Sequence, residues 1–259
     1  MRILCIGDPH GNLKELKKID YSGVDLILVT GDLSKADIAR RRYFKRIEGS
    51  EGISNSDKIE SFNEIYNSLF EVLNYLSKRA PVYFIFGDFD YSRLNIQERY
   101  GDLGIDLPDI IKEVNKIENA HIFQDKVINI NGIKIGCLER FIDTNWVRDF
   151  KPLDSSGKMK NAKEETSRAK EILDQFGKVD ILMCHQPPFG ILDKVKNSAA
   201  PKTWQGLNAG SELILEYIKD KQPSYVICGH IHEAEGEDRV SKSIIYNLGH
   251  CGHQFIEIE

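Results

Sequence analysis

The sequence predicts an α/β protein whose chemically active side chains gather at one edge of a sheet. Five apolar runs have the length and the β-branched and aromatic content of buried strands. Each run ends in Asp or His side chains, and the last of these are His10, Asp32, Asp90, His185 and His232. Ligands of open α/β sheets gather outside the carboxyl ends of the strands. We therefore expect these Asp and His side chains to meet and to form a metal site.

The segments between the first three strands have helical patterns. A short helix is expected near residues 12–18, and a long insertion follows over about 34–80. The insertion carries one apolar stripe with helical spacing, which consists of Ile59, Phe62, Ile65, Leu69, Val72 and Leu76. Asp57 is a candidate N-cap, with Glu60 three residues later. Strand–helix–strand units of this kind imply parallel pairing with right-handed crossovers.

The middle and the end of the chain predict a hairpin followed by further strands and helices. Asn131-Gly132 is a strong turn signal between two apolar segments. The polar stretch 149–163 is expected to be a loop, and 186–210 a long loop of the kind that usually carries function. The remaining expected elements are strands over 126–130, 133–138, 179–184, 224–228, 243–247 and 253–258, and helices over about 164–176 and 211–220.

Length, charge and cysteine content limit the classes of protein to which the chain can belong. The 259 residues predict a single domain over 1–259. A net charge of -5 disfavours a protein that coats nucleic acid, because binding to the phosphate backbone needs a basic face. No apolar stretch reaches the roughly 18–20 residues of a membrane span. The 5 cysteines form no CxxC pair and no secretory signal precedes the first strand, so we expect a cytoplasmic protein.

Two short motifs place pairs of ligands on one side of the chain. Asp8 and His10 are two residues apart after a strand, and side chains at i and i+2 of an extended backbone point the same way. His230 and His232 repeat this spacing with two imidazoles after a later strand. Glycines precede both motifs and let the backbone turn sharply as it leaves the sheet. Each pair alone is a weak signal, whereas the ordered set after five strands is a strong one.

With this set of motifs the chain resembles the calcineurin-like metallophosphoesterase family, whose pattern is D-x-H, G-D, G-N-H-D/E, H and G-H-x-H. The matching segments are Asp8-Pro-His10, Gly31-Asp32, Gly87-Asp88-Phe89-Asp90, His185 and Gly229-His230-Ile231-His232. The resemblance spans residues 1–232 and continues into Asn247-Leu-Gly249. It implies a four-layer αββα sandwich with two central mixed β-sheets and a dinuclear metal centre at the carboxyl-terminal rim of the strands.

The resemblance also implies a set of ligands for two ions. These are Asp8, His10 and His232 for the first ion, Asp88, His185 and His230 for the second, and Asp32 as the bridge. Oxygen and imidazole ligands without a thiolate suit two divalent or mixed-valence ions of Mn, Fe, Co or Zn. In such a centre a metal-bound hydroxide attacks the phosphorus of a phosphoester. The candidate catalytic residues are His230, His185, Asp32, Asp90 and His250.

Two residues depart from the family's third motif. The family's Asn ligand is Asp88 here, which lowers the formal charge of two divalent ions and one bridging hydroxide from +1 to zero. We therefore expect a weaker Lewis acid, or a trivalent ion in the second site, and weaker binding of product phosphate. The family's usual His is Phe89, which cannot donate a proton, and general acid help is worth about 10²–10⁴-fold. Its absence favours phosphodiesters and esters with good leaving groups.

Other side chains near the motifs are candidates for supporting roles. His250 follows the closing turn and is a candidate substitute proton donor, and Asp90 is expected to support a metal ligand. A basic cluster follows Asp32 and predicts either a solvated helix face or a phosphate-attracting lip. The cluster consists of Arg40, Arg41, Arg42, Lys45 and Arg46. The candidates for pocket lining, each also compatible with simple packing, are Trp204, Phe189 and Tyr91.

The sequence therefore predicts a metal-dependent phosphoesterase, either a phosphodiesterase or a phosphatase, that acts on a small phosphoester such as a nucleotide. Two alternatives stay open. The first is a catalytically weak or inactive scaffold for protein binding, which Asp88 and Phe89 support and the intact remaining ligands oppose. The second is a nuclease, which the acidic balance opposes. The sequence predicts no oligomeric state.

Overall fold

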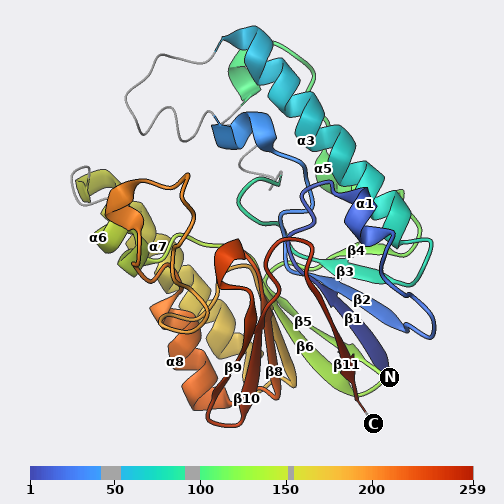
Figure 1. Ribbon diagram of the computed structural model, residues 1–259, viewed down its shortest axis with the longest axis vertical. Coiled ribbons are helices and arrows are strands. Elements are labelled where there is room, and N and C mark those ends of the chain that lie inside the picture. The colour runs from blue at the N-terminus through green and yellow to red at the C-terminus, as the bar shows by residue number, and fades with distance from the viewer. Residues whose placement is uncertain (42–53, 91–99, 151–154, 259) are drawn as a thin grey trace.

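The strands form two mixed β-sheets in the computed structural model, which describes residues 1–41, 54–90, 100–150 and 155–258 (Figure 1). The first sheet has the order β11-β1-β2-β3-β4 and consists of β1 (Arg2–Ile6), β2 (Leu26–Val29), β3 (Val82–Phe84), β4 (Ala120–Ile122) and β11 (His253–Glu257). The second has the order β5-β6-β7-β8-β10-β9 and consists of β5 (Lys126–Ile130), β6 (Ile133–Leu138), β7 (Ile181–Cys184), β8 (Tyr225–Cys228), β9 (Gly236–Val240) and β10 (Ser243–Asn247).

Helices follow most of the parallel strands. They are α1 (Leu13–Leu16), α3 (Asn55–Leu76), α5 (Ile110–Val114), α6 (Thr144–Phe150), α7 (Ser155–Phe176) and α8 (Glu212–Lys221). Shorter 3₁₀ helices are η1 (Gly101–Leu103), η2 (Lys202–Trp204) and η3 (His232–Ala234). The predicted insertion over about 34–80 contains a helical segment over 37–41 and α3. Among the described residues, no helix is both long and apolar enough to cross a membrane.

Strand pairing follows the expected parallel arrangement. β1, β2, β3 and β4 pair in parallel, and β11 closes one edge antiparallel to β1. In the second sheet β6, β7, β8 and β10 are parallel, and β5 and β9 lie antiparallel at the two edges. Parallel strands direct their carboxyl ends to the same edge, so residues that follow β1, β2 and β3 share one rim, and those that follow β7 and β8 share another.

Successive residues of the buried strands face two different hydrophobic clusters, and these clusters divide the molecule into four layers. On one face of the first sheet, Leu4, Val29 and Phe84 pack against α1, α3 and α5. On its other face, Leu28 packs in a cluster with Met183 of the second sheet. The outer face of the second sheet packs against α7 and α8. The two sheets therefore lie face to face between helical layers, which confirms the predicted αββα sandwich (Figure 1).

Helix α3 confirms the predicted apolar stripe, with differences at its first turn. The stripe residues from Phe62 to Leu76 are buried against the first sheet, but Ile59 is 38% exposed. The N-cap is Ser54 rather than Asp57, because the Ser54 hydroxyl accepts a hydrogen bond from the Asp57 backbone N–H at 3.2 Å. The helix therefore begins earlier than its apolar stripe.

The polar stretch 149–163, which the sequence predicts as a loop, is helical over its described residues, 149–150 and 155–163. Helix α6 extends to Phe150, and α7 begins at Ser155 rather than near residue 164. The added residues 155–163 include good helix formers, which are Lys158, Met159, Lys160, Ala162 and Lys163. The polar residues form the solvated face of the helix, and Ala162, Ala169 and Leu173 are buried on its opposite face.

The elements absent from the sequence prediction are short or polar. β9 has the sequence GEDRV, and its middle residues are exposed on the sheet edge. α5 and β4 have 5 and 3 residues, too few for a periodic pattern. The Asn131-Gly132 hairpin between β5 and β6 is confirmed, with Asn131 and Gly132 both at positive φ as such turns require.

Glu139, directly after β6, introduces a pH dependence of stability. Burial raises the pKa of its carboxyl to about 7; Asp125 and Glu165 act in the same direction and Arg168 opposes them. The folded-state pKa lies above the unfolded one, so this stability is present below about pH 4.5 and is lost as pH rises to about 7. We expect Glu139→Gln to raise the unfolding free energy at pH 8 by about 1–3 kcal/mol and to change it little at pH 4.

Urea unfolding of the wild type and of Glu139→Gln at pH 4 and pH 8 measures this difference. Glu171→Gln, at an exposed position of α7, is the matched control and should change the stability at neither pH. An equal effect of Glu139→Gln at both pH values would contradict the assignment of this titration to Glu139.

Candidate metal centre

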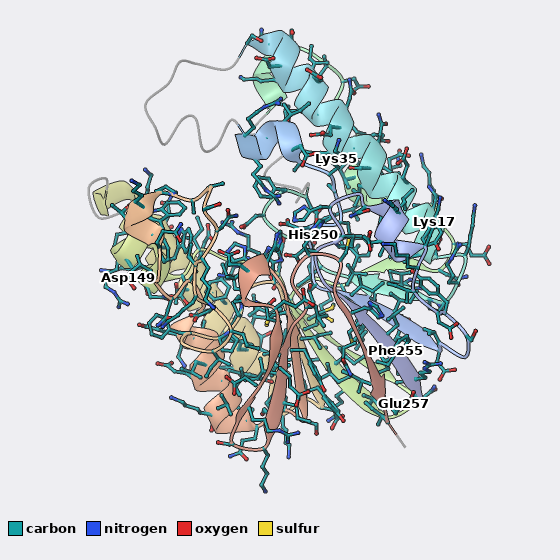
Figure 2. The ribbon with its side chains drawn as sticks, in the orientation of Figure 1. Lys17, Lys35, Asp149, His250, Phe255 and Glu257 are labelled. Atoms are coloured by element: carbon teal, nitrogen blue, oxygen red, sulfur yellow. The ribbon has the colours of Figure 1, made fainter. Side chains whose placement is uncertain are left out.

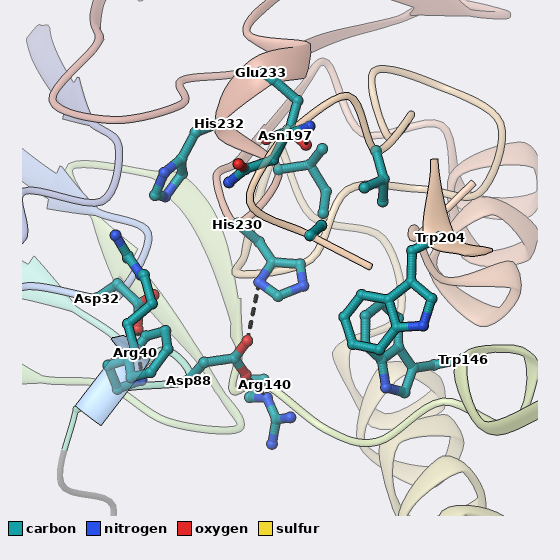
Figure 3. Close-up of a pocket in the computed structure, with 14 residues that line it drawn as sticks. Asp32, Arg40, Asp88, Arg140, Trp146, Asn197, Trp204, His230, His232 and Glu233 are labelled. Atoms are coloured by element: carbon teal, nitrogen blue, oxygen red, sulfur yellow. Dashed lines mark hydrogen bonds and ion pairs between the residues drawn. The ribbon is translucent and has the colours of Figure 1, made fainter. Parts of the chain in front are cut away.

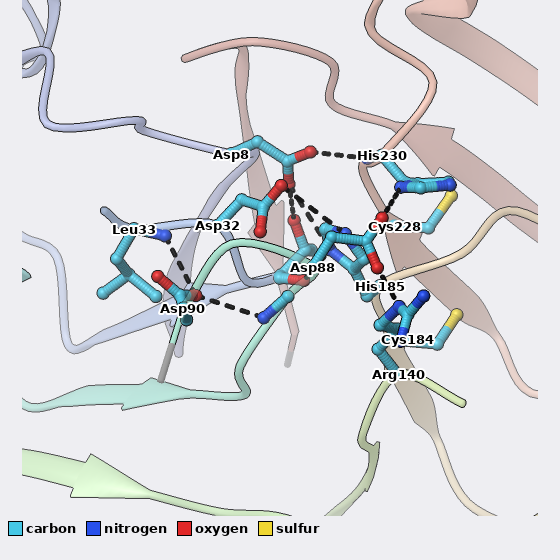
Figure 4. A network of polar contacts seen from close by, with 12 residues as sticks. Asp8, Asp32, Leu33, Asp88, Asp90, Arg140, Cys184, His185, Cys228 and His230 are labelled. Atoms are coloured by element: carbon cyan, nitrogen blue, oxygen red, sulfur yellow. Dashed lines mark hydrogen bonds and ion pairs between the residues drawn. The ribbon is translucent and has the colours of Figure 1, made fainter. Parts of the chain in front are cut away.

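The predicted ligands lie together where both sheets present the carboxyl ends of their parallel strands. Figure 4 shows five of them, which are Asp8, Asp32, Asp88, His185 and His230. The first sheet supplies the residues after β1, β2 and β3, and the second sheet those after β7 and β8. Three groups have ligand atoms within 4.8 Å of one another: Asp8, His10 and His232; Asp88, His185 and His230; and Asp8, Asp32 and His185. The first two groups are the two ligand sets that the resemblance implies.

The spacing of the first group suits direct coordination of one ion. His232 Nε2 lies 3.2 Å from Asp8 Oδ2 and 3.2 Å from His10 Nε2. Nitrogen and oxygen ligands about 2.0–2.2 Å from an ion stand roughly 3–3.5 Å apart. The three side chains are therefore already close to the separation that coordination requires.

The second group is similar, and Asp32 lies between the two. His230 Nδ1 lies 3.1 Å from Asp88 Oδ2. The Oδ2 atom of Asp32 lies 3.7 Å from His10 Nε2, in the first group, and 3.8 Å from His185 Nε2, in the second. One carboxylate oxygen thus faces both groups, which is the position of a bridging ligand.

Backbone carbonyls orient two of the imidazoles. His10 Nδ1 lies 3.2 Å from the Ser34 carbonyl oxygen, and His185 Nδ1 lies 3.0 Å from that of Thr30. Donation from Nδ1 leaves Nε2 free as the ligand atom, which is how metal-binding histidines are usually held. His185 Nε2 is buried and has no hydrogen-bond partner among the described residues. Since an unpaired buried nitrogen is costly, this atom fits a metal ligand.

The protonation states also suit metal binding. Burial lowers the pKa of His10 to about 3, and the charge of Arg40 acts in the same direction. Burial also lowers the pKa of His230 to about 3. For Asp8, burial opposes ionisation, but nearby imidazoles, first that of His185, outweigh it and hold the pKa of the carboxyl well below its usual range. Neutral imidazoles and ionised carboxylates are the forms that bind metals.

The backbone at the ligands is strained in the way that functional sites often are. His10, Asp32 and His230 have φ values of 44°, 44° and 68°, in the left-handed region that favours glycine. Such conformations cost about 1–3 kcal/mol each and persist where the surroundings enforce them. Gly87 is required because a Cβ there would lie 2.7 Å from His185 Cε1 and closer still to Asp32.

Asp90 supports the loops that carry two ligands. Its carboxylate is fully buried and accepts hydrogen bonds from the backbone N–H groups of Leu33 (3.2 Å), Ser34 (3.0 Å) and Gly87 (3.1 Å). The Ser34 hydroxyl donates a further bond of 2.6 Å. These contacts join the loop after β2 to the loop after β3. They favour a positioning role for Asp90 over direct contact with substrate.

Asp88 forms an ion pair with Arg140, a residue that the sequence analysis missed. Arg140 follows β6 in the second sheet, whereas Asp88 follows β3 in the first (Figure 4). The guanidinium compensates the charge that Asp88 adds to the centre. The expectation of a weaker Lewis acid counted Asp88 as an uncompensated charge, and Arg140 removes that premise. Its signal in the sequence was a cation placed two residues after a strand, at the same end as the ligands.

Arg40 and Phe89 lie together beside the first group. The Arg40 guanidinium carbon lies 5.1 Å from the centre of the Phe89 ring, and Arg40 Nη2 lies 2.9 Å from His10 Nε2. Arg40 must therefore withdraw from His10 before that nitrogen coordinates an ion. Of the two described members of the predicted basic cluster, Arg40 reaches the centre and Arg41 is exposed. The other members, Arg42, Lys45 and Arg46, lie outside the described residues.

His250 is the remaining histidine at this rim (Figure 2). Its ring centre lies 5.5 Å from those of both His10 and His232, and the residue is exposed. It is therefore adjacent to the first group and open to solvent, as a proton donor to a leaving group must be. A catalytic role for His250 stays a prediction.

A cavity of about 260 Å³ opens beside the ligands (Figure 3). Asp32, Asp88, His230 and His232 line one part of it, with Arg40 and Arg140. Trp204 lines another part, as the sequence suggested, together with Trp146, which the sequence analysis did not single out. Phe189 is not among its lining residues, and Tyr91 lies outside the described part of the chain.

Comparisons with known proteins agree with this architecture. The model of the family described as calcineurin-like phosphoesterase matches residues 1–234. UPF0046 protein T07D4.2 of Caenorhabditis elegans is 26% identical over 243 residues, which cover 91% of this chain and 52% of that protein. UPF0046 protein K07C11.7 of the same organism is 21% identical over 255 residues, which cover 97% and 70%. The chain thus spans about half the length of the first of these relatives.

Solved structures show the same fold at low sequence identity. Phosphopantetheinyl hydrolase (PptH) from Mycobacterium tuberculosis is similar with a TM-score of 0.52 and 13% identity, over 96% of this chain and 89% of that one. Another crystal structure is similar with a TM-score of 0.63 and 15% identity, over 98% and 94%. At these identities the likeness extends to the fold alone.

The four-layer sandwich with paired Asp and His groups at its rim is the architecture of the metallophosphoesterase class. Because the family match covers most of its length, the chain belongs to the calcineurin-like phosphoesterase family. Members of this class use divalent metals and hydrolyse phosphoesters. The donor set described above fits such ions on geometry and protonation.

Proposed function

We propose that the protein is a dinuclear metal-dependent phosphohydrolase that prefers phosphodiesters, or esters with a good leaving group. The observation that carries the proposal is the single Oδ2 atom of Asp32, which lies 3.7 Å from His10 and 3.8 Å from His185. A carboxylate oxygen between two ligand groups would serve two ions at once. The substrate is a small phosphoester, and a nucleotide is one candidate.

The chain's own residues then have distinct tasks. Two ions, when bound, would supply Lewis-acid stabilisation of the phosphoryl group and activation of water. Asp32, His185 and His230 would hold them, and the deep burial of His185 keeps bulk water away from that side. Arg40 and Arg140 line the cavity with positive charge that attracts the phosphate. No side-chain nucleophile is needed.

The preference for a good leaving group follows from Phe89. Its backbone N–H donates a 2.8 Å hydrogen bond to Asp32 Oδ1, so this residue is fixed at the centre, but its side chain has no proton to donate. Since general acid help is worth about 10²–10⁴-fold, poor leaving groups suffer most from its absence. His250 is the proposed partial substitute because it lies beside the first ligand group.

The proposal extends to the identity of the metal and to the location of the protein. Mn is the first metal to test, and an O/N donor set admits Fe, Co and Zn as well. A cytoplasmic location is supported by the free cysteines, four of which are buried in the core.

The first experiment loads the purified protein with Mn, measures bound metal, and compares an aryl phosphodiester with an aryl phosphomonoester. Two ions per chain and faster turnover of the diester are expected. His253→Ala, at an exposed position outside every ligand group, is the control and should retain both. Two bound ions without turnover of either ester would contradict the enzyme proposal and favour the protein-binding scaffold.

A further inference from the structure

The cavity beside the metal centre has an aromatic wall whose position is fixed by packing. Trp146 of α6 stacks on Phe150, with ring centres 4.0 Å apart and planes 14° apart. Trp204 of η2 meets Trp146 edge-on at 5.6 Å and Phe150 at 5.4 Å. Trp204 is 9% exposed, whereas Trp146 is half-buried and borders the cavity. One indole is thus held firmly and the other is left partly open.

This wall is tied to the metal centre by two sets of contacts. The Trp146 ring centre lies 6.3 Å from that of His230, a predicted ligand. The Glu233 carboxylate, next to His232, accepts the backbone N–H groups of Lys196 (2.8 Å) and Asn197 (2.7 Å). These bonds anchor the long 186–210 loop, which carries Trp204, to the segment that carries the histidines.

The cavity therefore has two chemically different ends. The ligand carboxylates, Arg40 and Arg140 form a charged end, and Trp146 and Trp204 lie across from it (Figure 3). A phosphoester with a flat apolar group suits both ends at once. The cavity volume of about 260 Å³ is small for a ligand pocket, which favours a substrate with one short substituent over a polymer.

We infer that Trp146 and Trp204 form a subsite for a planar aromatic ring carried by the phosphoester substrate. Aryl phosphates and nucleotides share this chemistry. The inference rests on the proposed function, because it places the phosphate of the same molecule at the metal centre. Stacking on an aromatic side chain typically strengthens binding by about 5–150-fold per ring. Trp146 is the specificity-determining residue, since it is the less buried of the two indoles that line the cavity.

The test uses two non-hydrolysable anions that differ in the ring alone, phenylphosphonate and methylphosphonate, with zinc-loaded protein. The chain has 2 tryptophans and both line the cavity, so tryptophan emission, excited at a wavelength that its 10 tyrosines do not absorb, reports on this site. We expect phenylphosphonate to bind at least about 10-fold more tightly and to change the emission. A second pair, adenosine 5′-monophosphate against ribose 5-phosphate, asks whether a nucleobase is preferred over a simple aryl group.

Two variants separate the subsite from the rest of the site. Trp146→Leu should bring the two phosphonate affinities to within about 2-fold while leaving methylphosphonate binding unchanged, and Trp146→Phe should retain most of the preference. Calorimetry measures these affinities without tryptophan emission. Equal affinities in the wild type, or an unchanged ratio in Trp146→Leu, would overturn the subsite even with turnover intact. Absence of bound zinc and of methylphosphonate binding would instead count against the proposed function.

Discussion

Replacing Asp32 by Asn is expected to remove metal from both positions and to slow phosphodiester hydrolysis by about 10³-fold or more. The Oδ2 atom of Asp32 faces His10 and His185 at nearly equal distances, so its charge serves both ligand groups. Metal assistance is worth several kcal/mol, and each 1.36 kcal/mol is tenfold in rate. Metal content by mass spectrometry and steady-state turnover measure the two effects.

Asn is the sharpest replacement at this position because it changes little else. Asn tolerates the φ of 44° that Asp32 adopts, and its Oδ1 can still accept the Phe89 N–H. Asp238→Asn, on the exposed edge strand β9, is the matched control and should behave as the wild type. Two ions per chain together with more than a tenth of the activity in Asp32→Asn would show that this carboxylate does not bridge.

The ligand residues were predictable because the signal for each one is local. Asp8, Asp32 and His185 each follow an apolar run, and a parallel sheet brings the ends of such runs to one rim. The αββα sandwich was predicted from the family resemblance that these motifs support, rather than from hydrophobic periodicity. Continuous apolar runs predicted the central strands, because both faces of each sheet are covered.

The parts that sequence reasoning missed depend on contacts between distant segments. Arg140 pairs with Asp88 across the two sheets, and no local pattern relates a residue after β6 to one after β3. Trp146 joins the cavity because α6 packs beside η2, and α6 itself lay at the edge of a stretch predicted as a loop. The first turns of α7 were predicted as a loop because their composition is polar. The buried side of these turns includes a small residue, Ala162, which gives a weak apolar signal.

The Asp88–Arg140 ion pair predicts effects of opposite sign on cations and anions. Arg140→Gln removes one positive charge, so the protein should retain metal more tightly and bind inorganic phosphate about 5–30-fold more weakly. Asp88→Asn removes one negative charge, so it should bind metal more weakly and phosphate more tightly. A side-chain charge about 6 Å from a bound ion would interact with it by roughly 3 kcal/mol at an effective dielectric constant of about 20. Because the Arg140 and Asp88 side chains are partly exposed, the actual effect is smaller.

The double variant Asp88→Asn/Arg140→Gln decides whether the two charges compensate each other. It restores the charge of the wild type and the family's usual Asn, so phosphate inhibition should return to within about 3-fold of the wild-type value. Metal affinity, measured by competition with a chelator, and phosphate inhibition are compared in the wild type, both single variants and the double variant, which form a double-mutant cycle. Arg239→Gln, exposed on β9, controls for a general loss of positive charge. A purely structural pair would weaken both cation and anion binding in each single variant, because loss of either partner would then disorder the same loop. Additive effects without rescue would likewise contradict compensation.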